Sequence, residues 1–196
     1  MIIEDGNGSS TQAKVSKKSR LYTFAVTEEK SKNATIDGRS YNINTGSIEL
    51  TSANESGVLY IKNNEDNDLH IDFVVVILGA STGGASTDDV IVEIIRNPTT
   101  GTLISNATSV DVNSNRNFGS NNTLTIDAYK GAEANTVTDG DQHILSLLSP
   151  STRGVFDIDA LLPKGASIAV TLNPPASNTS MDVMVAAICH LEDPNE

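Results

Sequence analysis

The chain has no tryptophan, and aromatic residues make up only 4% of its 196 positions. Its core must therefore be built from Val, Ile, Leu and Ala, and β-branched side chains suit pleated sheets. The single cysteine, Cys189, excludes an intramolecular disulfide framework, and its apolar surroundings (VMVAAIC) indicate a buried thiol rather than a nucleophile. No apolar run is long enough to span a membrane, and the N-terminus lacks the basic and apolar regions of a signal peptide. We therefore expect a protein that is made, and stays, in a cytoplasm or in something assembled there.

Basic residues are also scarce: 13 Lys and Arg stand against 25 Asp and Glu, so the net charge is −12. No Lys or Arg follows Lys164. The first twenty residues carry four basic and two acidic side chains, so this segment is +2 and the other 176 residues are −14. Such an acidic body repels nucleic acid and anionic membranes, and we expect neither as a partner. Residues 1–19 are polar and without period, which predicts a flexible basic arm. The arm and the residue after it supply the candidate attachment residues Lys14, Lys17, Lys18 and Arg20.

Residues 20–196 predict one all-β domain, because short apolar or alternating runs are separated by turn signals and no long amphipathic helix is evident. Residues 37–46 look like a turn, and residues 143–150 suit a strand or a short helix. The expected strands are 21–29, 47–52, 57–64, 69–79, 90–97, 123–131, 143–150, 154–160, 166–175 and 181–192. The segments 47–52 and 57–64 look like a strand pair. Antiparallel strands with long polar loops favour a jelly-roll sandwich with less than about 15% helix.

The last third of the chain supplies the predicted core. Residues 154–160, 166–173 and 181–190 are expected to be adjacent core strands. The core candidates are Ile168, Val170, Val183, Val185, Ala187 and Cys189.

The run from Phe73 to Leu78 is apolar on both strand faces. One face (Val74, Val76, Leu78) should pack on the other sheet, because a strand that is apolar on both faces is covered on both. The other face (Phe73, Val75, Ile77) should pack on a neighbouring subunit or a long loop. We expect a homotrimer on this ground.

Two closing segments carry a resemblance. LLPKGASIAVTLNPP followed by MDVMVAAICHLE resembles the final strands of single jelly-roll domains. Asn-, Ser- and Thr-rich segments such as YNINTGSIELTS and IIRNPTTGTLISNATSVDVNSNRNFGS are similar to virion structural proteins of tailed bacteriophages. The resemblance covers about residues 20–192. It implies a head decoration (cement) protein of the virion, assembled in the host cytoplasm, which forms a trimer on the major capsid protein.

Residues of catalytic or metal-binding type are present without the spacing that such chemistry needs. His70, His143 and His190 each stand alone in the sequence, without the spacing of a zinc site. The acidic turns around Asp66 and Asp139 do not match the twelve-residue calcium loop. We therefore expect neither metal ligands nor a cofactor.

The pair Asp157 and Asp159 lies two residues apart in an alternating run, so both should point to one strand face. A glycosidase carboxylate pair has similar separation, but no tryptophan platform for a sugar exists here, and an exposed strand face explains the pair better. Phosphate-binding glycine motifs and the nucleophile elbow are also absent. We expect no catalytic residues.

The composition leaves two functional classes open, because jelly-roll domains occur in structural proteins and in binding modules alike. The first is a non-enzymatic decoration protein that binds and stabilises the outer surface of a phage head. The alternative is a receptor- or glycan-binding fibre or tail module at a virion or cell surface, for which only Tyr22, Tyr41, Tyr60 and Tyr129 offer large polar aromatic contacts.

A chain that begins at Leu21 tests the role of the arm. It should fold and trimerise, since the strands are intact, but should no longer bind undecorated particles in a cosedimentation assay. Binding by the full-length chain should weaken as salt rises, because the proposed contact is electrostatic. Equal binding by the truncated and full-length chains would place the attachment surface on the sandwich.

Overall fold

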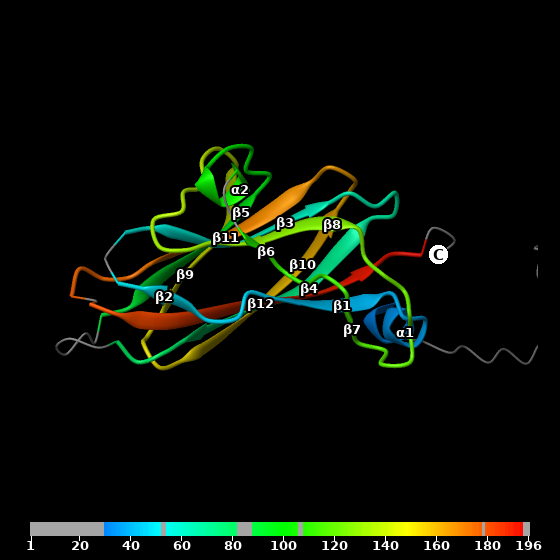
Figure 1. The fold of residues 1–196 in the computed structure, drawn as a ribbon, viewed down its shortest axis with the longest axis horizontal. Coiled ribbons are helices and arrows are strands. Elements are labelled where there is room, and N and C mark those ends of the chain that lie inside the picture. The colour runs from blue at the N-terminus through cyan, green and yellow to red at the C-terminus, as the bar shows by residue number, and fades with distance from the viewer. Residues whose placement is uncertain (1–29, 52–53, 82–87, 106–107, 178, 194–196) are drawn as a thin grey trace, which may run out of the picture.

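Two antiparallel β-sheets pack face to face across a core of aliphatic side chains (Figure 1). The computed structural model describes residues 30–51, 54–81, 88–105, 108–177 and 179–193. Within these ranges, 53% of residues lie in strands and 7% in helices, which confirms the all-β expectation. The expected arm (1–19) and the first expected strand (21–29) lie outside the described residues.

The first sheet has the strand order β10-β4-β12-β1-β7, and β2 also pairs with β12. Its strands are β1 (Ser40–Asn44), β2 (Ile48–Leu50), β4 (Leu69–Leu78), β7 (Ser114–Asn115), β10 (Arg153–Leu162) and β12 (Met181–Leu191). The second sheet has the order β6-β8-β3-β11-β5-β9. Its strands are β3 (Ser56–Asn63), β5 (Val90–Arg96), β6 (Thr108–Ser109), β8 (Ile126–Lys130), β9 (Asp141–Leu148) and β11 (Ser167–Asn173).

Nine of the described strands pair from the outside of the sequence inward. β1 and β2 pair with β12, β3 with β11, β4 with β10, and β5 with β9, all antiparallel. The chain between β5 and β9 adds β8 and β6 to one edge of the second sheet and β7 to one edge of the first. Successive pairs therefore alternate between the sheets: the pairs of β12 and β10 lie in the first sheet, and those of β11 and β9 lie in the second.

Two short helices lie outside the sheets (Figure 1). α1 (Lys30–Ile36) lies beside β1 and β12 and buries Ala34. It ends before Gly38, whose φ of +70° is a conformation that glycine adopts without steric cost. α2 (Thr102–Ser105) lies over the second sheet, where Leu103 packs with Tyr60 and Ala169. Neither helix was predicted from the sequence, because both are too short to show a helical period.

Alternation of apolar side chains correctly predicted which residues face the core. All six core candidates are buried, from Ile168 at 5% exposure to Cys189 at 0%. Val74, Val76 and Leu78 are also buried, as expected for the inward face of β4. Residues 143–150 lie mostly in β9, which resolves the strand-or-helix alternative in favour of a strand.

Strand partners were predicted less well. Residues 154–160 and 181–190 are not adjacent, since β4 lies between β10 and β12, and residues 166–173 lie in the other sheet. β2 and β3 are also in different sheets rather than paired. The expected turn over residues 37–46 contains β1, which pairs with β12. These errors share a cause, because side-chain alternation is local whereas pairing depends on distant segments.

The substitution Val185→Asp tests the position of β12. Val185 is fully buried opposite Val76, so a carboxylate there is an unpaired buried charge and should cost about 3–5 kcal/mol of unfolding free energy. Urea denaturation measures this loss. The control is Phe118→Asp at a fully exposed position in a turn, which should cost about 1 kcal/mol or less. Equal costs at both positions would contradict the inward placement of Val185.

Candidate functional site

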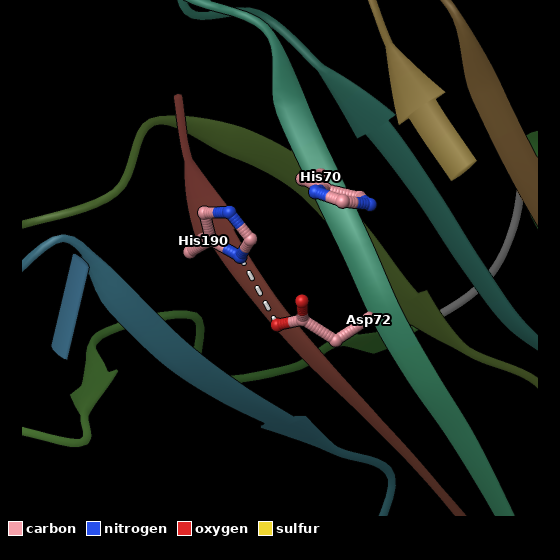
Figure 2. Close-up of side chains that lie close together, drawn as sticks. All are labelled: His70, Asp72 and His190. Carbon is pink, nitrogen blue, oxygen red and sulfur yellow. Dashed lines mark hydrogen bonds and ion pairs between the residues drawn. The ribbon is translucent and has the colours of Figure 1, made fainter. Parts of the chain in front are cut away.

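Two histidines that are far apart in the sequence are cross-strand neighbours in the first sheet. His70 on β4 is in register with His190 on β12, and their ring centroids are 4.8 Å apart. Figure 2 shows both rings on the same side of the two strands. His70 and His190 stand alone in the sequence, but the pairing of β4 with β12 makes them neighbours in space. His143 lies on β9 in the second sheet and is exposed.

One ring nitrogen of each histidine is hydrogen-bonded to a carboxylate. Asp159 Oδ1 lies 2.8 Å from His70 Nε2. Asp72 Oδ2 lies 3.1 Å from His190 Nδ1, the contact drawn as a dashed line in Figure 2. An ionised carboxylate only accepts hydrogen bonds, so these two nitrogens carry the protons. In the neutral imidazoles, the lone pairs then lie on His70 Nδ1 and His190 Nε2.

Two β-bulges position these carboxylates. The β4–β12 register shifts between Ile188 and Cys189, so that Asp72 is the extra residue of β4. The β10–β4 register shifts between Asp157 and Ala160, and Asp159 lies in that shift with a φ of +43°. Bulges re-aim side chains next to functional sites, and a positive φ at a non-glycine residue is uncommon. Asp157 and Asp159 are both exposed and flank the buried Ile158, as expected for an exposed strand face, but the register shift between them interrupts the regular ladder.

The two remaining ring nitrogens are buried and face a third carboxylate. Neither His70 Nδ1 nor His190 Nε2 has a hydrogen-bond partner among the described residues. Glu192 Oε1, just beyond β12, lies 3.3 Å from the first and 3.8 Å from the second. The other Glu192 oxygen, Oε2, is 3.3 Å from Lys30 Nζ on α1. The side chain of His190 is only 2% exposed.

A hollow of about 230 Å³ opens beside this cluster. It is lined by Asp66, Asn67, Asp68, Glu192 and Asp193. The hollow connects the Glu192 side of the cluster with the acidic turn between β3 and β4, so small cations have an approach to it.

The sequence carried a weak signal for this cluster. His70 and Asp72 on β4, and His190 and Glu192 at the end of β12, each follow the two-residue spacing that favours one strand face. Only the pairing of β4 with β12, and of β4 with β10, unites these pairs with Asp159.

The outward side of the first sheet carries an apolar surface, which we call the first face. Its most exposed side chains lie in rows across β10, β4 and β12, with Val155 opposite Val75 and Met184 opposite Ile77. The first face consists of Phe73, Val75, Ile77, Val155, Met184, Ala186 and Ile188. Arg153 lies at its margin, opposite Ile77. Phe73 and Ile77 are each 38% exposed, so no loop within the described residues covers them fully.

A second apolar surface, the second face, lies on the outward side of β5 and β9. It consists of Ile91, Leu145 and Leu147, and the two leucines are each 61% exposed. Glu93 lies among them, in register with Leu145. Burial raises the pKa of Glu93, and the nearby Glu55 raises it further. No ion-pair partner of Glu93 or Arg153 is found in the described part of the chain.

The other acidic groups that the sequence singled out have protein partners. Asp66 pairs with Lys164 at 2.5 Å, and this contact lowers the pKa of Asp66. Asp139 accepts hydrogen bonds from Thr99 and Thr100. The candidate attachment residues lie outside the described residues. They are Lys14, Lys17, Lys18 and Arg20.

Comparison of the chain with protein-family models, with curated proteins and with solved structures finds no match. No helix within the described ranges is long and apolar enough to cross a membrane.

Cys189 should be unreactive in the folded protein. Burial raises the pKa of its thiol to about 12, and only the thiolate is nucleophilic. Ellman's reagent at pH 8 should therefore label the folded chain slowly and the urea-unfolded chain at once. Rapid labelling of the folded chain would contradict the burial of this side chain.

Proposed function

We propose that this protein is a non-enzymatic virion structural protein, a homotrimeric jelly-roll decoration protein that binds the outer surface of a phage head through the major capsid protein. The observation that carries the proposal is the presence of two separate apolar faces on the outside of an acidic sandwich. Exposed apolar patches of this kind mark association surfaces.

The pairing of the strands supports the jelly-roll assignment. A jelly roll has eight strands in two sheets, connected as two Greek keys. With β1 and β2 taken as one interrupted strand, the two four-stranded arrays are β1/β2-β12-β4-β10 and β3-β11-β5-β9. Early strands pair with late strands from the outside of the sequence inward, which is the pairing of a long antiparallel ribbon wrapped around a core.

Two different faces favour a ring over a two-fold dimer. A two-fold interface uses one surface twice, whereas a heterologous interface joins two different surfaces and generates a ring when the rotation between copies closes. We place the first face of one copy against the second face of the next. Arg153 at the first face and Glu93 in the second then meet as opposite charges, and pairing offsets the cost of burying Glu93.

Charge supports the rest of the proposal. The strongly acidic body stays soluble and discourages non-specific association. The basic arm before the sandwich supplies a second contact that folds on its partner. Three arms on one trimer multiply a modest contact into firm attachment.

A charge exchange tests the proposed trimer. Arg153→Glu or Glu93→Arg alone should convert the trimer to monomers, because each places two like charges in the interface. The double variant carrying both changes should recover the trimer, since the opposite charges meet again. Sedimentation equilibrium at micromolar concentration reports the mass of each.

Lys164→Glu is the matched control, because it makes the same change of charge as Arg153→Glu at an exposed turn outside both faces. It should remain trimeric. A monomeric wild-type chain would defeat the trimer. A trimeric wild type whose double variant stays monomeric would defeat the pairing of Arg153 with Glu93.

A further inference from the structure

The geometry points to a metal site that the sequence did not predict: His70, His190 and Glu192 bind one divalent transition-metal ion, with Zn²⁺ as its first candidate. The ligand atoms are His70 Nδ1, His190 Nε2 and Glu192 Oε1. This inference goes beyond the proposed function, because the site includes no residue of the first or the second face.

The cluster needs a positive charge at its centre. Asp159 and Asp72 fix the protons on the outer nitrogens, so both inner nitrogens present lone pairs to a carboxylate oxygen. The two nitrogens lie 3.3 and 3.8 Å from Glu192 Oε1, are buried and have no hydrogen-bond partner, so these acceptors repel unless a positive charge lies between them, either a proton on an imidazole or a metal ion. A metal ion satisfies all three at once.

The distances suit a small ion. Zinc ligands lie about 2.0–2.1 Å from the metal, so donors at tetrahedral corners are about 3.3–3.4 Å apart. The separation of 3.3 Å between His70 Nδ1 and Glu192 Oε1 has this length. The separation of 3.8 Å to His190 Nε2 closes with a small movement of the Glu192 side chain. A water molecule would supply the fourth ligand, and the hollow lined by Glu192 lies next to the site.

The surroundings are those of a built site. Metal-bound histidines donate their other N–H to a carboxylate, which fixes the ring and the tautomer. Here each histidine has such a carboxylate, and both carboxylates are delivered by β-bulges. Lys30 engages Glu192 Oε2 and leaves Oε1 directed at the histidines.

The donor atoms decide the class of metal. Two imidazoles and one carboxylate suit Zn²⁺ and its first-row neighbours, whereas Ca²⁺ and Mg²⁺ prefer oxygen ligands. One ligand atom from each of His70, Asp72 and His190 lies within 4.8 Å of the others, which makes Asp72 the alternative carboxylate ligand. Its hydrogen bond to His190 Nδ1 assigns it the positioning role.

The ion would fasten the end of β12 to β4. Glu192 follows β12 and donates its backbone N–H to Asp68 O, so the metal would join the segment after β12, β4 and the acidic turn. Binding to the folded state alone raises stability.

The test uses the full-length chain after EDTA treatment and dialysis. Isothermal titration with ZnCl₂ should show one tight site per chain, and Zn²⁺ should raise the melting temperature. Co²⁺ should produce visible d–d absorption of a tetrahedral or five-coordinate site. His70→Ala should weaken Zn²⁺ binding by about 100-fold or more, and Asp159→Asn by about 10- to 100-fold.

His143→Ala is the matched control, since it removes an exposed histidine from the other sheet. It should bind Zn²⁺ like the wild type. Glu192→Gln, close to the surface, serves if His70→Ala does not fold, and should weaken binding at least tenfold. In the wild type, ¹⁵N NMR should show His70 Nδ1 and His190 Nε2 shifting on addition of Zn²⁺ while His143 does not. Unchanged shifts of both nitrogens, or Zn²⁺ affinity equal in the wild type and the Glu192→Gln variant, would overturn the proposal.

Discussion

Pairing of β12 with β4 on one side, and with β1 and β2 on the other, is the contact on which the first sheet depends. Among the described residues, β12 is the last strand and β1 and β2 are the first, so this pairing closes nearly the whole described chain into one loop. Long-range pairing of this kind costs chain entropy before it returns contact energy. Burial of Val183, Val185 and Ala187 against the second sheet offsets that cost.

The same pairing brings the two histidines together on the outward side of the sheet. The register that buries Cys189 leaves His190 on the outward side next to His70. The bulge that follows adds Asp72 without disturbing the buried residues on either side, Ile71 and Val74. The outward side is thereby divided into an apolar part, the first face, and a polar part around the histidines. A regular ladder without bulges would present one continuous surface.

Sequence patterns predicted most long strands and their inward residues, since alternation records the difference between core and solvent. They failed for β1, where Asn42 and Asn44 lie on the outward face and make the segment look like a turn. They also failed for the order of the strands. The aromatic shortage correctly predicted an aliphatic core, yet the residues around His70 gave only a two-residue spacing that many exposed strands share.

The sequence by itself determined the all-β class, the buried faces of the C-terminal strands and the contrast in charge between the basic first twenty residues and the acidic remainder. Each of these follows from the local order of residue types or from composition. Only the tertiary structure decided that His70 meets His190, that Asp72 and Asp159 hold them, and that two apolar faces stay outside. These facts depend on which strands pair and where a bulge shifts the register, and both are set by contacts between distant segments.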